Sequence, residues 1–246
     1  MFSIFKKKYS KPLDFSGLRV DMHSHVLPGI DDGAPDSEVS RELISGLKDL
    51  GYEKLVATPH VIRDMYNNDA KTINGARRMM EDDLKMAGVD IPLRAAAEYF
   101  MDDHFKQMVE KGTELLTIHE NKVLVEFSFV TAPLDYKEQF FQLQINGYQP
   151  ILAHPERYSY LWNRRELFDE LKSIGCLFQL NILSLTGHYG KAAVDMAQYL
   201  IKKDYINLVG TDLHHSRHLD ALRHSSGIAE TINDLLHSGR LLNPTL

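Results

Sequence analysis

Short apolar runs alternate along the chain with longer segments that are apolar on one side only. Residues 54–58 have the length of a buried strand, and residues 69–87 repeat apolar side chains at helical spacing. Seven such pairs follow one another. The predicted strands are 18–22, 54–58, 92–97, 122–127, 149–153, 176–181 and 206–210. The predicted helices are 37–50, 69–87, 101–111, 134–146, 164–173, 189–203 and 219–237.

This alternation predicts an α/β fold. Repeated strand–helix units form a parallel sheet covered by helices, and seven of them in this length suit a closed or nearly closed TIM-like (β/α)7 barrel. A doubly wound open sheet is the alternative. No Pro/Gly/Ser linker divides the chain, so we expect a single domain over residues 18–246. Residues 1–17 are predicted to form a basic, flexible leader, with contact to an anionic membrane surface as the alternative role.

Composition narrows the classes of partner and site. A net charge of -6 over 246 residues argues against a broad basic surface for nucleic acid. The single cysteine, Cys176, excludes an internal disulfide and a multi-thiolate zinc site, so any metal must be held by nitrogen and oxygen. No apolar run has the length of a signal peptide or a membrane span, so we expect a cytoplasmic protein without stable membrane insertion.

His, Asp and Glu residues gather just after the predicted strands. In a barrel the carboxyl ends of the strands meet at one mouth, so such residues should lie together. For any one position, a hydrogen-bonded core residue or a solvated surface residue is a commoner explanation than a metal ligand. Chance placement does not explain why such residues follow six of the seven predicted strands. The candidate donors are His23, His25, Asp32, His60, Glu98, Glu126, His154, Asp212 and His214.

The number of donors indicates more than one metal ion. The rings of His23 and His25, two residues apart on a strand, point to the same side and can reach one ion. A single cation takes roughly four to six ligands, so nine donors fit two or three ions of the Zn, Mn or Fe type. Neighbouring ions of this kind stabilise the attacking and leaving oxygens in phosphoryl transfer. The sequence therefore predicts a metal-dependent phosphoesterase.

The candidate donors belong to recognisable motifs. These are Asp21-x-His23-x-His25, Leu27-Pro28-x-Ile30-Asp31-Asp32-Gly33, Thr58-Pro59-His60, Ala97-Glu98-Tyr99, His154-Pro155-Glu156-Arg157 and Thr211-Asp212-x-His214. Together they resemble the motifs of the PHP (polymerase and histidinol phosphatase) superfamily. Within it, the sequence is most similar to the bacterial capsular or exopolysaccharide tyrosine phosphatase family. The resemblance extends from about residue 18 to the end of the chain.

The resemblance implies a fold, a metal and a substrate. It implies a distorted seven-stranded barrel and a trinuclear site that prefers manganese (Mn2+), with Fe, Zn, Co and Mg as alternatives. The implied substrate is the phosphotyrosine tail of a membrane-associated bacterial tyrosine autokinase that controls polysaccharide export. Such a partner would recruit the protein to the inner face of the membrane. The sequence carries no signal for an oligomeric state.

The resemblance also implies how the donors are shared. The first ion would take His23, His25, Glu98 and Asp212. The second would share Glu98 and add Glu126 and His154. The third would take Asp32, His60 and His214.

Two arginines are candidates for holding phosphate. Arg157, in a motif that the family shares, is the first candidate because its guanidinium fork can bind two phosphate oxygens, and Arg217 is the second. As a hypothesis, a hydroxide that bridges two metal ions attacks phosphorus in line with the phenolic leaving oxygen. An open mouth for phosphotyrosine needs aromatic side chains, although core packing is the alternative for each of them. The candidates are Tyr66, Phe100, Phe127, Phe129, Tyr158 and Tyr160.

Other functions use the same donors. Histidinol-phosphate phosphatase, or another PHP phosphoesterase such as a nuclease-like phosphodiesterase, would need only a different pocket. A protein of another class, a non-catalytic metal-binding regulatory scaffold, would keep the ligands without turnover. His215 and His218 have three alternative roles: they are loop residues, they orient the metal ligands, or they contact the substrate. Residues 63–68 are a candidate lid. The remaining histidines, expected at the surface, are His104, His119, His188, His224 and His237.

Overall fold

The computed structural model describes residues 13–246 and contains all seven predicted strand–helix pairs, with two additional short strands just beyond the predicted strands 54–58 and 92–97. The strands are β1 (Val20–Asp21), β2 (Lys54–Ala57), β3 (His60–Val61), β4 (Leu93–Ala95), β5 (Glu98–Phe100), β6 (Lys122–Glu126), β7 (Gln149–Ala153), β8 (Leu177–Asn181) and β9 (Ile206–Gly210). The α-helices are α1 (Ser37–Asp49), α2 (Ala70–Met86), α3 (Asp103–Glu110), α4 (Tyr136–Ile145), α5 (Glu166–Ser173), α6 (Lys191–Lys202), α7 (Ser216–Arg223) and α8 (Ala229–His237).

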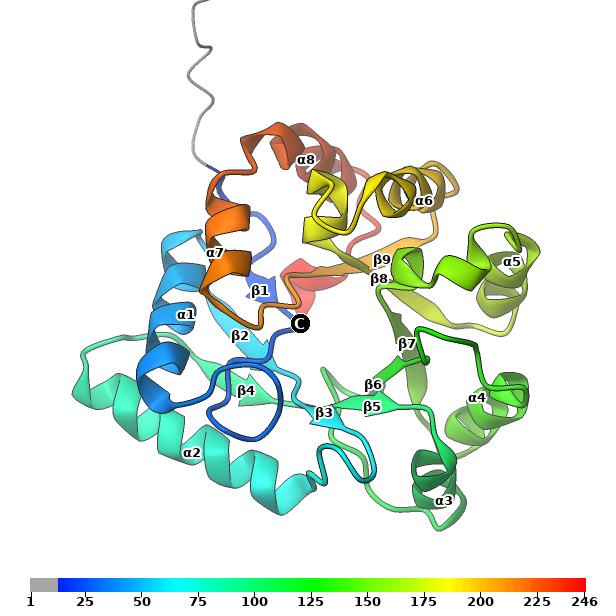
Figure 1. Ribbon diagram of the computed structural model, residues 1–246, viewed down its shortest axis with the longest axis horizontal. Coiled ribbons are helices and arrows are strands. Elements are labelled where there is room, and N and C mark those ends of the chain that lie inside the picture. Colours follow the sequence, from blue (N-terminus) through cyan, green and yellow to red (C-terminus); the bar gives the residue numbers. More distant parts are fainter. Residues whose placement is uncertain (1–12) are drawn as a thin grey trace, which may run out of the picture.

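The strands form two parallel sheets that together make a distorted barrel. One sheet has the order β1-β2-β4 and the other the order β3-β5-β6-β7-β8-β9. The chain passes from the first sheet to the second at Thr58–Pro59 and again at Ala96–Ala97. Figure 1 shows the helices arranged around the strands, as the alternation of elements predicts. The predicted α/β class with a parallel sheet is confirmed.

The barrel is closed between its first and last strands. Ser24 and Leu213 form a parallel bridge just beyond β1 and β9. The amide of Asp212 donates to the carbonyl oxygen of His23 at 2.8 Å, and both oxygens of the Asp21 carboxylate accept hydrogen bonds from Thr211. These contacts favour the barrel over the open-sheet alternative.

Two apolar clusters occupy the two sides of the strands. Successive residues of β6 alternate between them: Leu124 packs in the smaller cluster, whereas Val123 and Val125 pack in the larger one with residues of the helices. Leu242 and Leu246, near the carboxyl end of the chain, pack against the smaller cluster. Figure 1 places that end at the centre of the ring of strands.

Most predicted bounds lie within two residues of the observed ones, but two predictions differ by more. The predicted helix 219–237 is two helices, α7 and α8, with a 3-10 turn at Ser226–Ile228 between them. The packed chain also begins before residue 18, because Leu13 and Phe15 are buried in the larger cluster. The rest of the predicted basic leader, residues 1–12, lies outside the described residues. Within residues 13–246, no helix is both long and apolar enough to cross a membrane.

Candidate metal centre

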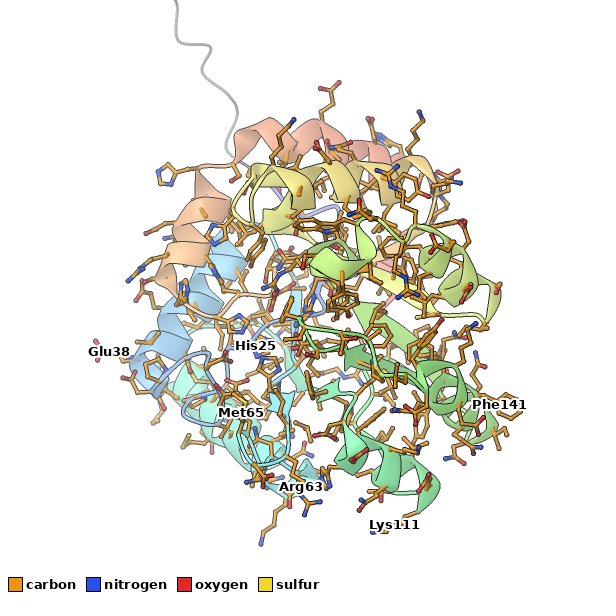
Figure 2. The ribbon with its side chains drawn as sticks, turned by 45° about the vertical axis from the view of Figure 1, so that its right-hand side comes forward. His25, Glu38, Arg63, Met65, Lys111 and Phe141 are labelled. Atoms are coloured by element: carbon orange, nitrogen blue, oxygen red, sulfur yellow. The ribbon has the colours of Figure 1, made fainter. Side chains whose placement is uncertain are left out.

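The nine predicted donors lie together at the carboxyl ends of the strands. Each has a side-chain nitrogen or oxygen within 3.5 Å of another donor in the set. Seven of the nine are buried, whereas the Asp32 side chain keeps 50% of its surface exposed. Figure 2 shows His25 in the interior of the molecule, while Lys111 and Phe141 lie at its periphery. The structure therefore brings together every residue that the sequence nominated as a ligand.

Glu98 is at the centre of this cluster. Its Oε2 atom lies 3.3 Å from Nε2 of His23, 3.3 Å from Nε2 of His25 and 3.1 Å from Nδ1 of His60. Its other oxygen, Oε1, lies 3.2 Å from Nε2 of His154. A carboxylate surrounded by imidazoles on both oxygens is suited to bridging two ions.

Unpartnered polar atoms support the fit of a cation to these residues. Glu98 Oε2 and His60 Nδ1 are buried and make no hydrogen bond among the described residues, although they lie 3.1 Å apart. Buried polar atoms without partners are rare in folded proteins and each needs a cause. Imidazole nitrogen and carboxylate oxygen together suit divalent transition metals, so a cation between these atoms satisfies both.

The donor atoms form three groups compact enough for one ion each, with every atom of a group within 4.8 Å of the others. The groups are His25, Asp32, His60 and His214; His23, His25 and Asp212; and His60, Glu98 and Glu126. The first contains the set that the family resemblance gave to the third ion. His154 stands outside the last group, yet its Nε2 lies 3.5 Å from Glu126.

Charges in the cluster shift several pKa values strongly. Burial, together with Glu98 and Asp212, raises the pKa of Glu126 well above its usual range. For Glu98, burial opposes ionisation, but His23 and His60 hold its pKa well below the usual range. Burial likewise opposes the charged form of His25, yet the Asp31 carboxylate leads the contacts that raise its pKa well above the ordinary value. Protons on imidazole therefore balance the buried carboxylates, which is a role that a cation would take over.

Three histidines are oriented by hydrogen bonds at Nδ1. The partner is Gln179 Oε1 for His23 at 2.9 Å, and Asp31 Oδ2 for His25 at 2.8 Å. His214 Nδ1 donates to the backbone oxygen of Asp212 at 2.9 Å. With Nδ1 occupied, Nε2 is left to face the cluster, as in many metal sites.

The sequence analysis missed Gln179 and gave Asp31 no role of its own. The signal for Gln179 is a polar residue inside the apolar strand β8, where it is fully buried. Asp31 appeared in the sequence analysis only as part of the motif Ile30-Asp31-Asp32-Gly33.

Two of the donors have an unusual backbone conformation. His154 has φ 34° and Asp212 has φ 51°, although neither is glycine. The left-handed region is uncommon for such residues, and it tends to persist where a site requires it. At both positions a strand has just ended, so the turn directs the side chain into the mouth of the barrel.

Arg157 adjoins the donors, and Arg217 does not. The Nη1 atom of Arg157 donates to Asp212 Oδ2 at 2.6 Å. Its guanidinium carbon lies 4.8 Å from the ring centre of Phe129 and 4.2 Å from that of Tyr189. Burial and this nearby cation lower the pKa of His154 to about 4. Arg217 is exposed at the start of α7 and forms no ion pair among the described residues, so its role in holding phosphate stays a prediction.

The additional histidines form a rim beside the cluster. His218 is nearly buried, and its Nδ1 accepts a hydrogen bond from the amide of His214 at 3.4 Å. The ring of exposed His215 lies 3.9 Å from that of His218. His218 therefore supports the loop that carries His214. Of the histidines expected at the surface, His188, His224 and His237 are exposed, and His104 and His119 are partly exposed.

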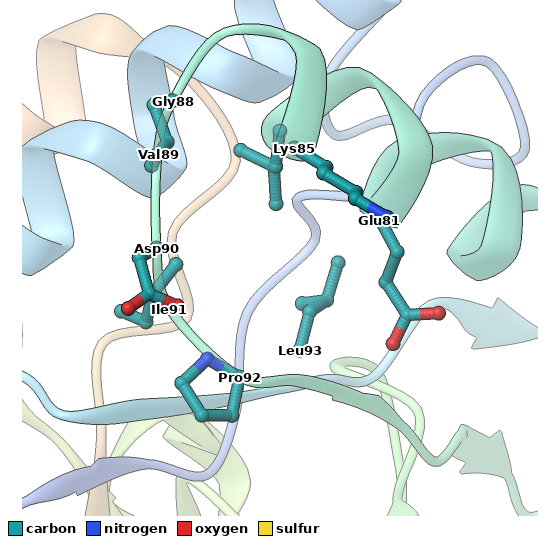
Figure 3. Close-up of a pocket in the computed structure, with 9 residues that line it drawn as sticks. Glu81, Lys85, Gly88, Val89, Asp90, Ile91, Pro92 and Leu93 are labelled. Carbon is teal, nitrogen blue, oxygen red and sulfur yellow. The ribbon is translucent and has the colours of Figure 1, made fainter.

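A cavity of about 420 Å³ lies away from this centre, between the end of α2 and β4 (Figure 3). Leu84, Val89, Ile91 and Leu93 give it a largely apolar wall, and Glu81 and Lys85 stand at its edge. It adjoins the amino end of β4, whereas the donors lie at the carboxyl ends of strands. None of the nine donors lines it.

Comparison with known proteins gives consistent matches. A family model described as capsular polysaccharide synthesis, CpsB/CapC, matches residues 19–225. The tyrosine-protein phosphatase YwqE of Bacillus subtilis is 30% identical over 196 residues, which are 79% of this chain and 77% of that protein. The tyrosine-protein phosphatase CpsB of Streptococcus pneumoniae is 26% identical over 202 residues, or 79% of this chain and 82% of that protein.

A solved structure is also similar. It comes from crystal structures of YwqE from B. subtilis and CpsB from S. pneumoniae, described as metal-dependent tyrosine phosphatases. The TM-score is 0.78 at 27% sequence identity, and the match covers 87% of this chain and 86% of the other.

Proposed function

Because this chain belongs to the CpsB/CapC family of capsular polysaccharide synthesis proteins, we propose that it is a metal-dependent protein-tyrosine phosphatase. The predicted phosphoesterase activity agrees with the activity named for the relatives. The observation that carries the proposal is a cluster of nine nitrogen and oxygen donors, in which four imidazoles lie within 3.3 Å of Glu98 and one arginine stands at the edge.

We assign the nine donors to divalent metal ions, with manganese as the preferred ion and Fe, Zn, Co or Mg as alternatives. The support is chemical: the donors mix imidazole and carboxylate, and the buried Glu98 Oε2 and His60 Nδ1 atoms make no hydrogen bond to any residue that the structure describes. When bound, such ions lower the pKa of water and neutralise charge on the phosphoryl group. Gln179 and Asp31 hold the rings of His23 and His25 so that Nε2 faces the ion.

Arg157 binds the phosphoryl oxygens in this proposal. Its hydrogen bond to Asp212 uses one of the five N–H donors of the guanidinium, and the planar fork suits phosphate. The leaving group of phosphotyrosine is a phenol with a pKa near ~10, so it departs more readily than an alkoxide. The demand for a strong general acid among the protein side chains is therefore small.

We further propose that the substrate is the phosphotyrosine tail of a membrane-associated bacterial tyrosine kinase. The protein would then work in the cytoplasm and reach the inner face of the membrane through that kinase. The family model that matches this chain is described as capsular polysaccharide synthesis, and a named relative is the tyrosine-protein phosphatase CpsB. Both are consistent with such a partner. The packed residues 13–246 constitute one catalytic domain in this proposal.

The test is a comparison of substrates with the metal content known. The protein is purified without chelator, its metals are quantified, and phosphate release is measured from a tyrosine-phosphorylated peptide and from histidinol phosphate. We expect manganese-dependent release from the peptide that EDTA suppresses. Asp212→Ala is the inactive control. A preference for histidinol phosphate would refute the tyrosine phosphatase, and metal binding without turnover of either substrate would indicate a scaffold.

A further inference from the structure

The aromatic residues near the strand ends differ in exposure. Phe127 and Tyr158 are fully buried and belong to the core. Phe129, three residues beyond the predicted ligand Glu126, keeps 45% of its surface exposed. A half-exposed phenyl ring at the mouth of a polar cluster leaves part of its surface open to a ligand.

Phe129 touches both parts of the proposed phosphate site. Its ring centre lies 5.6 Å from that of His154, with the two planes only 15° apart. The guanidinium carbon of Arg157 lies 4.8 Å from the same ring centre. One aromatic side chain therefore adjoins a predicted metal ligand and the group proposed to hold phosphate.

The loop that carries Phe129 is fixed at its start. The amide of Phe127 donates to the hydroxyl oxygen of Tyr158 at 3.0 Å, and the hydroxyl of Tyr160 donates to the carbonyl oxygen of Ser128 at 3.0 Å. The Phe129 ring also lies 5.5 Å from the ring of Tyr158. The ring is thus held in place before any substrate binds, which favours a binding surface.

We propose that Phe129 is the wall of a subsite for the aryl ring of the substrate, so that it selects aryl phosphates over alkyl phosphates. In an aryl phosphate the ring is joined to phosphorus through one oxygen. Once the phosphoryl group is held between the metal centre and Arg157, the ring must lie against a surface that adjoins both. Phe129 is such a surface, and an alkyl group gains less from it because it has no flat face. This inference rests on the proposed phosphatase function.

Tyr66 is the alternative candidate for the wall of the aryl subsite. The ring of Tyr66 stacks on that of His60, with centres 5.7 Å apart and planes 14° apart. His60 contacts one oxygen of Glu98 and His154 contacts the other, so Tyr66 and Phe129 border different sides of the centre. Arg157 adjoins Phe129 and is the reason to choose that side.

The test measures binding without turnover. Calorimetric titration of the manganese-loaded protein with phenylphosphonate and with methylphosphonate gives two dissociation constants, whose ratio reports the ring subsite. We expect the wild type to favour phenylphosphonate by on the order of tenfold. Phe129→Ala should bring that ratio close to one and leave methylphosphonate binding unchanged, and Phe129→Leu should give an intermediate ratio.

Phe141 supplies the matched control. It is 55% exposed on α4 at the periphery of the molecule (Figure 2), so Phe141→Ala removes a similar ring without touching the centre. Equal weakening of both phosphonates in Phe129→Ala would overturn the proposal and show that Phe129 only positions Arg157. Loss of aryl preference in Tyr66→Ala but not in Phe129→Ala would also overturn it. Hydrolysis of the phosphotyrosine peptide by the wild type is measured separately. If the wild type hydrolyses the peptide, a negative result for Phe129 refutes only this subsite. If it does not, the proposed function itself is refuted.

Discussion

Replacing Gln179 by methionine should weaken metal binding without unfolding the protein. The Gln179 side chain is fully buried, and its Oε1 atom accepts a hydrogen bond from His23 Nδ1 at 2.9 Å. Methionine has a similar length and volume but offers no comparable acceptor. The substitution therefore removes the atom that orients the His23 ring and leaves the apolar packing largely in place.

The size of the effect follows from burial. An unpaired N–H in a dry site costs about 1–3 kcal/mol, so the His23 ring gains by turning toward another acceptor. Turning misdirects Nε2, which faces Glu98 at 3.3 Å and Asp212 at 3.4 Å. Loss of such an orienting partner typically lowers metal affinity by about 10- to 100-fold, which is about 1.4–2.7 kcal/mol.

Competition with a fluorescent chelator measures manganese affinity, and thermal unfolding measures stability. Gln139→Met is the matched control, because Gln139 is also buried but lies on the outer helix α4 and donates to Asp135, the residue before that helix. We expect its unfolding free energy to fall by about 1 kcal/mol with manganese affinity unchanged. Wild-type affinity in Gln179→Met, or an equal loss in both variants, would refute the reasoning.

Three further predictions concern Arg157, the pH dependence of metal binding and Cys176. Arg157→Ala should raise KM for a phosphotyrosine peptide on the order of tenfold or more with metals retained, because a charge-assisted phosphate contact is lost; metal loss on elemental analysis would contradict this. Manganese affinity should fall as the pH is lowered, because the Asp31 carboxylate, against the opposing effect of burial, holds the pKa of His25 well above its ordinary value and protons compete with the ion; a titration independent of pH would argue against this site. Burial raises the pKa of the Cys176 thiol to about 12, so a thiol reagent at about pH 8 should label it only after unfolding.

The sequence predicted the elements because local pattern determines them. An apolar run such as Ile206–Gly210 is a strand at those bounds, and α1 begins where the Asp36 side chain accepts a hydrogen bond from the amide of Val39. The two short strands β3 and β5 were not predicted. β3 has two residues and β5 has three, too few for periodicity to register, and their pairing depends on neighbours distant in sequence.

The donors were predictable for a similar reason, since each stands at or after the end of a predicted strand. The residues that orient them were not. Gln179 and His23 are 156 positions apart, and nothing local to either residue indicates the contact. Phe129 likewise could not be told from Phe127 by sequence, although one is half exposed and the other is buried. Only the closed barrel decides which of two aromatic residues in one short segment faces the site.

Closure of the barrel and assembly of the metal centre depend on the same contacts. Asp21 begins the first motif and Thr211 begins the last, and the Thr211 hydroxyl donates to the Asp21 carboxylate at 2.7 Å. Burial of that carboxylate raises its pKa to about 6, and the hydrogen bonds from Thr211 oppose the rise. Beside the contact between Asp21 and Thr211, the amide of Asp212 donates to the carbonyl oxygen of His23. The metal-ligand candidates that follow β1 and β9 therefore lie side by side. Asp21 and Thr211 therefore serve the centre without being ligands, because they set the register in which the first and last strands meet.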